Sequence, residues 1–354
     1  MNLAIKACTS EKRVFESQVP GQVHSVSTES GLSSRREPVP HPDVCAVMVT
    51  YDPEPGFEQN VRSLLPQVGK LIIVDNRSSS AAHSLIQQTA STHGVEVIWN
   101  EQNLGIAGAL NRGIDRALAS AQYRWIATFD QDSHMPPHYM RTIFESYSKC
   151  PFRDKVAIIG GTYVSPAREF PADPMSGRNG SGFREVKTLM TSGSVLKSSA
   201  FSECGRFDQS LFMDCVDHEF CLRLRRHGFR VIQANQALLA HQPGSPTSHR
   251  ILWKRVTTTN HSASRRYYNA HNRMLVYRRY LTSEPLWAIR DVSDWFRDIV
   301  KLVLLEKDRT DKLVSIARGT WAAMLATPAY PTGVVNEGRV HITATHTRDK
   351  SAVD

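Results

Sequence analysis

Two aspartates stand one residue apart at the end of an apolar run, in the stretch WIATFDQDSHMPP (residues 125–137). Asp130 and Asp132 allow two interpretations. Loops after strands are often rich in Asp and Ser, because these side chains hydrogen-bond their own backbone. Two carboxylates at this spacing can also share Mg²⁺ or Mn²⁺, since such cations prefer oxygen ligands and often bridge to substrate phosphates. The strands and loops around the two aspartates are needed to choose between a turn and a cation site.

The composition is that of a globular, basic protein. The chain has 354 residues, of which 41% are hydrophobic, and a formal net charge of +9. This length is enough for one large domain with appendages or for two domains. The positive charge favours an anionic partner, which can be a nucleotide, a phospholipid surface or a nucleic acid. Because the basic residues are spread among acidic ones rather than clustered with aromatics, we expect no nucleic acid as partner.

Other classes of protein are disfavoured by what the sequence lacks. The six cysteines form no C-x-x-C pair, and no Cys/His cluster has the spacing of a zinc site. We therefore expect reduced thiols in a cytoplasmic protein. No uncharged apolar run approaches about 18 residues, and the N-terminus has no signal-peptide core. We expect neither a membrane-spanning helix nor secretion.

From residue 43 onward, apolar runs typical of buried strands alternate with helical patterns. Such alternation predicts an α/β fold with a mainly parallel sheet that helices cover on both faces. The expected strands are 43–53, 70–76, 94–100, 123–130 and 155–161, and the expected helices include 56–68 and 103–120.

Polar residues follow several of these strands. Asp75 and Asp130 end two of them, and Thr50 and Tyr51 end the first. In open parallel sheets the ligand lies beyond the carboxyl ends of the strands. This convergence favours a ligand site over separate turn residues, although Asp75 could also cap the turn DNRSSS that follows it.

The order of these motifs resembles the inverting glycosyltransferases of family 2, and within them the rhamnosyltransferase branch. The similarity runs from about residue 44 to 330. It includes AVMVTYDP, NEQNLGIAGALNRGIDRAL, WIATFDQDSHMPP, the segment 191–244 and RYYNAHNRMLVYRRY (266–280). The resemblance implies a GT-A fold, with a central mainly parallel sheet and a C-terminal helical extension. We expect a disordered N-terminal segment (1–42), a catalytic domain (43–250), a helical region (251–330) and a flexible tail (331–354).

The resemblance also implies roles for residues around a sugar-nucleotide donor. Thr50 and Tyr51 would touch the nucleotide, and Asp75 would accept a hydrogen bond from its base or ribose. Three further residues, Asn103, Gly105 and Asn111, belong to the segment that shapes the nucleotide pocket.

The residues of the reaction itself follow from the same resemblance. Asp130 and Asp132 form a D-x-D motif that binds Mg²⁺ or Mn²⁺ and, through it, the diphosphate. Asp217 matches the catalytic base, and His241 matches a histidine that can complete the metal or diphosphate site. A base on the far side of the sugar and a direct displacement give inversion, by analogy with inverting glycosidases.

Several of these residues have a structural interpretation as well. Asp214 and Glu219 compete with Asp217, and Glu219 has an ion-pair partner in Arg223 four residues on. His241 could be structural. The residues Ser192, Gly193 and Ser194 could bind acceptor or phosphate, or form a strand with a close backbone contact. The basic residues Arg223, Arg225, Arg226 and Arg230 could line the diphosphate or form a solvated face.

Two features near the C-terminus concern the acceptor. His271 stands where relatives commonly have an arginine before Asn272, which puts that contact in doubt and points to a different acceptor. Residues 284–309 read as an amphipathic helix whose Trp287 and Trp295, with basic neighbours, suit peripheral membrane contact. Packing against the catalytic domain or a partner explains the same pattern equally well.

The function expected from the resemblance is metal-dependent transfer of L-rhamnose from dTDP-L-rhamnose onto a glycan or lipid-linked acceptor. The setting would be surface polysaccharide biosynthesis. Another donor, UDP-galactofuranose or UDP-N-acetylglucosamine, is the first alternative. A haloacid-dehalogenase-type phosphatase also carries Asp-x-Asp, but Ser133 and His134 follow here instead of Thr and Val or Leu.

Overall fold

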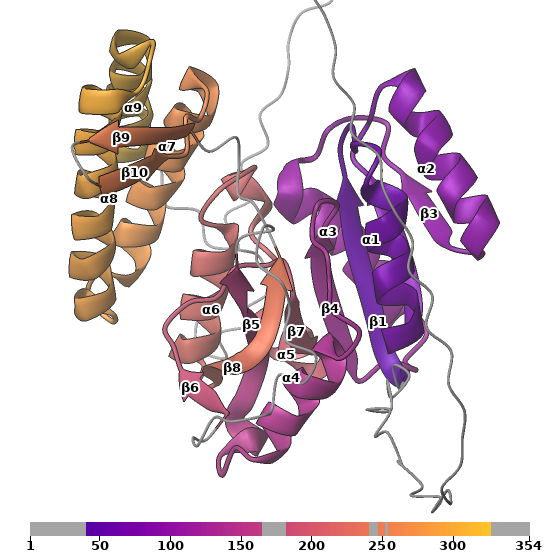
Figure 1. Ribbon diagram of the computed structural model, residues 1–354. Coiled ribbons are helices and arrows are strands. Elements are labelled where there is room, and N and C mark those ends of the chain that lie inside the picture. The colour runs from indigo at the N-terminus through magenta and orange to yellow at the C-terminus, as the bar shows by residue number, and fades with distance from the viewer. Residues whose placement is uncertain (1–39, 165–181, 241–246, 252–253, 327–354) are drawn as a thin grey trace, which may run out of the picture. The chain divides into compact units, whose positions relative to one another are not determined.

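The computed structural model describes residues 40–164, 182–240, 247–251 and 254–326 (Figure 1). These residues all belong to one compact unit, Glu37–Asp354. The expected N-terminal segment and the tail 331–354 fall almost wholly outside them. Only the last residues of the expected segment 1–42 are described, and there the first strand begins at His41.

The central element is an eight-stranded sheet with the order β3-β2-β1-β4-β7-β5-β8-β6. Strands β3, β2, β1 and β4 pair in parallel, as do β5 and β8, whereas β7 and β6 are antiparallel to their neighbours. The mainly parallel α/β sheet that the sequence predicts is thereby confirmed. The strands are β1 His41–Thr50, β2 Val68–Asp75, β3 Glu96–Trp99, β4 Trp125–Asp130, β5 Val156–Val164, β6 Phe183–Glu185, β7 Ser194–Lys197 and β8 Arg230–Ala240.

Helices cover both faces of this sheet. Alternate residues of β1 enter two different clusters: Val47 belongs to the cluster with α3, α5 and α6, and Met48 to the cluster with α1, α2 and α4. A strand buried on both faces reads as one continuous apolar run, which is why the sequence pattern identified it. The helices are α1 Phe57–Leu64, α2 Ser80–His93, α3 Gly105–Leu118, α4 Tyr139–Ser148, α5 Ser198–Cys204 and α6 Val216–Arg226.

Strand β7 is the main departure from the expected order. It lies between β4 and β5 and runs antiparallel to both. It has only four residues, SVLK, too few for a reliable periodicity. Its insertion brings the segment before Ser194 next to the carboxyl end of β4, where the aspartates lie.

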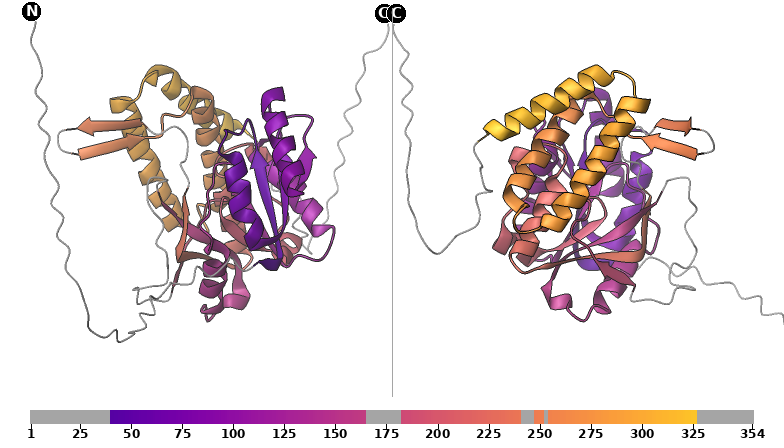
Figure 2. Two further views of the ribbon diagram at one scale, coloured as in Figure 1. Left: turned by 45° about the vertical axis from the view of Figure 1, so that its right-hand side comes forward. Right: turned by 90° about the vertical axis from the view of Figure 1, so that its left-hand side faces the viewer.

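The C-terminal region is helical, as expected (Figure 2). An antiparallel pair, β9 Thr247–Ile251 and β10 Lys254–Thr258, precedes α7 Ala263–Tyr280, α8 Pro285–Leu305 and α9 Arg309–Leu325. Buried Glu306 accepts hydrogen bonds from Arg266 at 2.9 Å and from Lys312 at 3.0 Å, which ties the three helices together. Among the described residues, no helix is both long and apolar enough to cross a membrane.

Candidate active site

The ends of three neighbouring strands meet at the carboxyl edge of the sheet. Strand β1 pairs with β2 on one side and with β4 on the other, so that Thr50 lies opposite Asp75 and Val49 lies opposite Asp130. The Thr50 hydroxyl donates a hydrogen bond to Asp75 Oδ1 at 3.2 Å. The register of a parallel sheet therefore gathers residues that are distant in the sequence.

Asp75 is buried and caps the turn after β2, which is the structural role considered from the sequence. The Ser78 backbone N–H donates to Oδ2 at 3.0 Å, and the Ser78 hydroxyl donates to Oδ1 at 2.5 Å. With Thr50, these bonds occupy three of the roughly four acceptor positions of a carboxylate. They fix the orientation of the group and leave acceptor capacity for a ligand donor, so the cap and a ligand contact are compatible.

Gln131, the middle residue of the D-x-D motif, holds that motif against the loop after β1. Its side-chain oxygen accepts from the Tyr51 N–H at 2.7 Å, and its amide nitrogen donates to the Tyr51 carbonyl at 3.0 Å. Asn60 of α1 donates to the Gln131 carbonyl at 2.8 Å. Sequence reasoning missed Gln131, because a glutamine between two aspartates carries no periodic signal. The Tyr51 side chain itself is exposed at this edge.

A network of asparagines shapes the segment between β3 and α3. Asn76 donates to Asn103 Oδ1 at 2.8 Å, and Asn100 donates to Asn76 Oδ1 at 3.1 Å. Asn103 Oδ1 also accepts from the Gly105 N–H at 2.9 Å. Asn103 thus lies in the segment named from the sequence, and its amide organises the backbone there. Asn76 and Asn100 were not singled out.

Helix α3 connects this segment to the loop that precedes α6. Gly105 has φ +70°, and a Cβ on it would stand 2.2 Å from the Phe212 carbonyl oxygen, which accepts from the Ile106 N–H at 2.8 Å. Asn111 forms two hydrogen bonds with the Phe207 backbone, at 2.9 and 3.0 Å. Both residues join the half of the fold that contains Asp75 to the half that contains Asp217.

Asp130 and Asp132 lie at the carboxyl end of β4 and in the turn after it, where Asp130 is partly exposed and Asp132 exposed. The Asp130 N–H donates to the Ser192 hydroxyl at 3.0 Å, and the Ser133 and Ser192 hydroxyls are 2.6 Å apart. Ser192 is buried, and its hydroxyl contacts both the Asp130 backbone and the Ser133 side chain. Gly193 has φ +71°, and a Cβ on it would stand 2.6 Å from Tyr139 Oη. The close backbone contact considered for residues 192–194 is present.

The carboxylate oxygens at this edge of the sheet are suitable ligands for a divalent cation that also binds the substrate. In the described part of the chain, no group of three or more His, Cys, Asp or Glu side chains could hold a metal ion. Asp130 and Asp132 supply two carboxylates, and Mg²⁺ is usually held by one or two carboxylates together with substrate phosphates. His241, the third expected ligand, lies outside the described residues.

Tyr163 near the end of β5 was not expected and links both halves of the site. Its hydroxyl donates to the Ser192 carbonyl oxygen. Burial raises the pKa of Tyr163 well above its ordinary value, and the charges of nearby groups, among them Asp130 and Asp217, raise this pKa further. Tyr163 therefore stays neutral and lies within electrostatic reach of both carboxylates.

Asp217 occupies the first turn of α6 and is partly exposed. Its Oδ1 accepts from the N–H of His218 at 2.8 Å. The partial positive charge of a helix N-terminus stabilises a carboxylate at this position. The loop before α6 is held by the buried Asn272 of α7, which donates to the Met213 carbonyl at 2.5 Å and to the Asp214 carbonyl at 3.2 Å.

The two competing acids have cationic partners. Glu219 is fully buried and forms an ion pair with Arg223 at 2.7 Å, as its alternative interpretation held. Asp214 forms an ion pair with Arg265 at 3.0 Å. No ion pair among the described residues involves Asp217. Asp217 is thus the acid of the three that combines partial exposure with a position outside the ion pairs.

The four basic residues 223, 225, 226 and 230 do not form one solvated face, because Arg223 is buried and only Arg226 among them is exposed. Arg223 neither lines a diphosphate site nor faces solvent: it is buried and also donates to the carbonyls of Cys204 and Arg206. Arg225 and Arg230 form ion pairs with Glu185 rather than a free basic face. Glu185 is distant from both arginines in the sequence, so the ion pairs could not be predicted from the charge pattern of the helix.

His271 contacts residues of its own helix. Its ring Nδ1 lies 2.9 Å from Asn272 Oδ1, and the ring stacks on Tyr267 with centroids 5.9 Å apart. In this structure the side chain that replaces the arginine of relatives is therefore engaged within α7.

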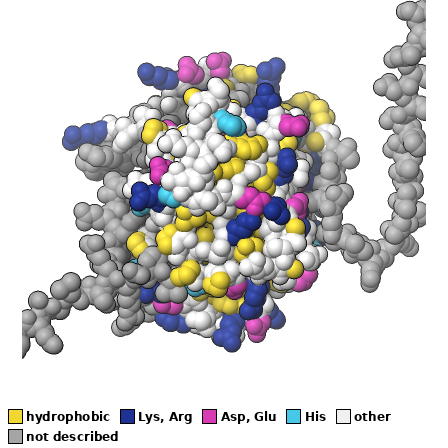
Figure 3. Space-filling view, turned by 90° about the vertical axis from the view of Figure 1, so that its right-hand side faces the viewer, with side chains coloured by type: hydrophobic (Ala, Val, Ile, Leu, Met, Phe, Trp, Pro, Cys, Tyr) yellow, Lys and Arg dark blue, Asp and Glu magenta, His cyan; other side chains and the backbone are white. Residues whose placement is uncertain are grey.

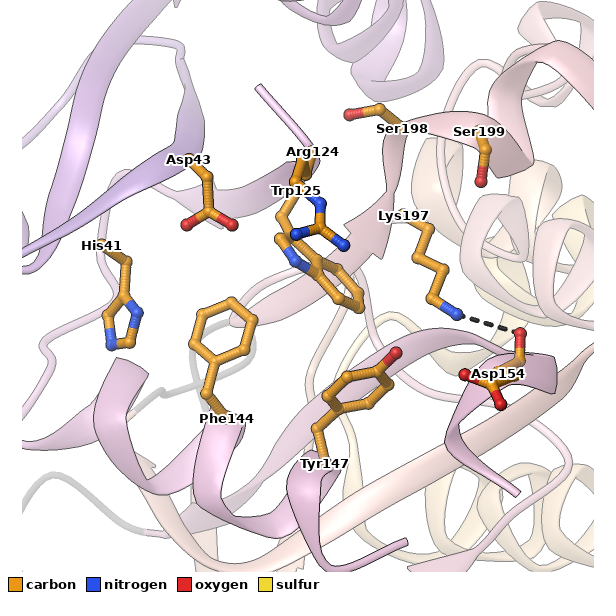
Figure 4. A pocket seen from close by; sticks show the side chains of 10 residues that line it. All are labelled: His41, Asp43, Arg124, Trp125, Phe144, Tyr147, Asp154, Lys197, Ser198 and Ser199. Atoms are coloured by element: carbon orange, nitrogen blue, oxygen red, sulfur yellow. Dashed lines mark hydrogen bonds between the residues drawn. The ribbon is translucent and has the colours of Figure 1, made fainter. Parts of the chain in front are cut away.

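A cavity of about 640 Å³ opens at the other end of the sheet (Figure 4). Its walls come from the start of β1, the start of β4 and the end of β7, whereas the aspartates lie at the carboxyl ends of the parallel strands. Lys197 donates to the Asp154 carbonyl at 3.0 Å along its rim. The cavity is separate from the site described above.

Two solved structures align with the chain at low sequence identity. A crystal structure of GalNAc-T7 with UDP, GalNAc and Mn²⁺ aligns with a TM-score of 0.49 and 12% identity, covering 66% of this chain and 47% of that one. This chain therefore spans about half the length of that protein. A crystal structure of S. aureus TarS 1-349 in complex with UDP-GlcNAc aligns with a TM-score of 0.49 and 11% identity, covering 79% of this chain and 81% of the other.

Sequence comparison is more specific. Residues 45–205 match the model of the family "Glycosyl transferase family 2". The dTDP-rhamnosyl transferase RfbF of Shigella flexneri is 26% identical over 253 residues, which cover 67% of this chain and 80% of that protein. The low-salt glycan biosynthesis hexosyltransferase Agl10 of Haloferax volcanii is 26% identical over 220 residues, 58% of this chain and 69% of that protein. The chain, which combines a mainly parallel sheet with C-terminal helices, is therefore similar to glycosyltransferases of family 2 and, among the relatives compared, to a rhamnosyltransferase.

Proposed function

We propose that the protein transfers L-rhamnose from dTDP-L-rhamnose, with inversion, onto a hydroxyl of a glycan or lipid-linked acceptor in surface polysaccharide biosynthesis. The observation that carries this proposal is the shared edge of the sheet. Thr50, Asp75 and Asp130 meet there through the register of β1, and the charges of Asp130 and Asp217 both act on the nearby buried Tyr163. In the proposal, Thr50 and Asp75 would contact the nucleotide and Asp130 would act on the diphosphate. Asp217 would act on the attacking hydroxyl.

The donor is proposed from similarity. RfbF is named a dTDP-rhamnosyl transferase, and its matching region covers 67% of this chain. Agl10 is named a hexosyltransferase, so a UDP-linked hexose is the alternative donor. In either case Asp75 would accept a hydrogen bond from the base or ribose, and the exposed Tyr51 ring would contact the base.

In the proposed reaction the residues of this chain divide the work between leaving group and nucleophile. Asp130 and Asp132 would hold Mg²⁺ or Mn²⁺, which as a Lewis acid stabilises the charge that develops on the diphosphate. Gln131 and Ser192 hold the backbone that carries these two carboxylates, through the hydrogen bonds described above. Asp217 would take the proton of the acceptor hydroxyl as it attacks the anomeric carbon from the opposite face.

Nucleic acid is not part of the proposal. Basic and acidic side chains are interspersed on the face of the molecule drawn in Figure 3, whereas proteins that bind nucleic acid gather basic residues on one face.

The test is a panel of sugar nucleotides with Mn²⁺ present, read first by thermal shift and then by release of nucleoside diphosphate. We expect dTDP-L-rhamnose to raise the melting temperature most, and release to depend on an added acceptor. Rapid hydrolysis of simple phosphomonoesters that disappears in Asp130→Asn would instead assign the haloacid-dehalogenase-type phosphatase. A larger shift with a UDP-sugar would reassign the donor and leave the class of reaction intact.

A further inference from the structure

Helix α8 exposes a row of large apolar side chains. Leu286, Ile289, Phe296 and Leu304 are 76%, 62%, 64% and 68% exposed. Their spacing of 3, 7 and 8 residues keeps them within one sector of the helix, since each residue turns it by about 100°. Val292, Val300 and Val303 are also exposed and lie in the same sector. Residues that the sequence predicts as an apolar stripe are thus left outside the core.

Helix α9 exposes a second group of the same kind. Trp321 is 65% exposed, and Val314 and Leu325, seven residues before it and four after it, share its side of the helix. Met324 is exposed beside them. These four residues and the seven exposed apolar residues of α8 are called the α8–α9 apolar face below.

The opposite side of α8 accounts for the packing of the helix. Trp287 is buried against His218 and Tyr277, and Trp295 packs near Ala270 and Leu302 while its ring lies 5.5 Å from the Arg273 guanidinium carbon. Trp287 is therefore buried and not available to a membrane, whereas Trp295 is partly buried. Because this side already supplies the contacts that dock α8, the α8–α9 apolar face is not needed for the core.

Cations border this face. Arg290, Arg297 and Lys301 follow the edge of the α8 row next to Leu286 and Leu304, and Arg318 stands within the exposed sector of α9. The acids that contact two of these cations, Asp294 and Asp298, lie farther round α8 from the apolar row. On α8 the charge closest to the apolar row is therefore positive, and of its three cations Arg297 and Lys301 also contact acids on the far side.

We propose that the α8–α9 apolar face docks on the surface of an anionic lipid bilayer. Helices that lie in the membrane interface combine an apolar side with basic residues along its border, and Trp is enriched at that depth. Anionic headgroups would neutralise Arg290, Arg297 and Lys301. A two-fold contact with a second copy would instead bring the cations of both copies to one interface. The proposal is independent of the sugar donor and of the acceptor.

The buried ion pairs of Glu306 with Arg266 and Lys312 give the face a defined shape. They join the end of α8 to α7 and α9, so that both exposed groups are carried by one packed set of helices. The face is accordingly present before any membrane contact, and binding requires no refolding of α8 or α9.

The experiment is flotation of the full chain with vesicles of phosphatidylcholine, with and without phosphatidylglycerol. We expect flotation with the anionic vesicles at low salt and release at high salt. Ile289→Ser with Phe296→Ser should lower the partition about tenfold or more, and Arg290→Gln with Arg297→Gln should lower it about fivefold per cation. Leu281→Ser, which removes an exposed leucine outside the face, and Arg62→Gln with Arg112→Gln, which remove exposed cations elsewhere, are the matched controls.

All variants are compared at an unchanged melting temperature, which exposed positions should allow. Absence of flotation with anionic vesicles at low salt would overturn the proposal. Equal flotation of Ile289→Ser with Phe296→Ser and of the wild type would overturn it too. A concentration-dependent dimer in light scattering, abolished by that double substitution while vesicles are not bound, would assign the face to a second copy.

Discussion

Asp217 and Glu219 lie on opposite sides of helix α6, although only one residue separates them. Two steps of about 100° turn their side chains some 200° apart. Glu219 is fully buried, where Arg223 and the Tyr280 hydroxyl donate to it at 2.7 and 2.8 Å. Asp217 is partly exposed in the first turn. The period of the helix thus places one acid in the core and the other partly at the surface.

Asp217→Asn keeps the size of the side chain and removes its basicity. We expect turnover to fall by about 10²–10⁴-fold, which is the usual contribution of a general base. Donor affinity should change little, because the base acts on the acceptor hydroxyl. Steady-state kinetics together with calorimetric binding of the donor measure the two effects separately.

Glu219→Gln is the counterpart in the same helix. It leaves Arg223 without its buried carboxylate, and breaking a buried ion pair typically costs about 3–5 kcal/mol of stability. We expect a lower denaturation midpoint, with turnover per folded molecule close to that of the wild type. A Glu219→Gln protein of native stability without transferase activity, beside an active Asp217→Asn protein, would reverse the two roles.

The D-x-D motif should control donor binding through the cation. We expect EDTA to stop transfer and Mn²⁺ to restore it, since the two carboxylates and the diphosphate share the ion. Calorimetry with the nucleoside diphosphate should show that Mn²⁺ tightens binding to the wild type and does so much less for Asp130→Asn. Full activity in EDTA would reduce Asp130 and Asp132 to polar contacts.

Gly105→Ala should loosen the junction between the two halves of the fold. Gly105 has φ +70°, and its Cβ would stand 2.2 Å from the Phe212 carbonyl oxygen. Gly94 at the end of α2 has φ +65° with nothing within 4 Å of a Cβ, so Gly94→Ala measures the backbone strain alone. That strain is about 1–2 kcal/mol. We expect Gly105→Ala to lose more stability than Gly94→Ala in urea unfolding. Equal losses would show that the Phe212 backbone moves away from the added Cβ without a cost in stability.

His261, just before α7, should make stability depend on pH. Burial, and then the nearby Arg265, lower the pKa of His261 from 6.5 to about 4, against the opposing charge of Asp214. Between these values the unfolded chain binds a proton that the folded protein does not, so this contribution is complete above pH 6.5 and is lost as the pH falls towards 4. We expect His261→Asn to flatten the fall of the melting temperature between pH 7 and pH 4.5. An unchanged slope would assign the acid sensitivity to other groups.

The parts of the fold that the sequence predicted are those with strong local signals. Strands β1, β2 and β4 each appear as a continuous apolar run because both faces are buried, and helix α3 carries apolar residues at helical spacing. Strand β7 was expected only as one alternative for residues 192–194, because four residues carry no period and its place between β4 and β5 depends on pairing with distant segments.

The amphipathic helix 284–309 likewise has one property with a local sequence signal and one that depends on distant segments. Its existence as α8 was predictable from the 3.6-residue period of its apolar residues. Which apolar residues would be buried was not, because both Trp287 and Phe296 fit an apolar helix and only the packing of α7 decides between them. Both tryptophans were expected at the membrane contact; the structure buries Trp287, leaves Trp295 partly buried and exposes Ile289 and Phe296.

By itself, the sequence determined the class of the fold, the family and the polar residues that end the strands, because hydrophobic period and motif order are local properties of the chain. Only the tertiary structure decided what each polar residue contacts. Gln131 and Ser192 support the aspartates, and Asn111 bonds to the backbone of Phe207. Hydrogen bonds and ion pairs join residues that are distant in sequence, and their partners are chosen by the register of the sheet and the packing of helices upon it.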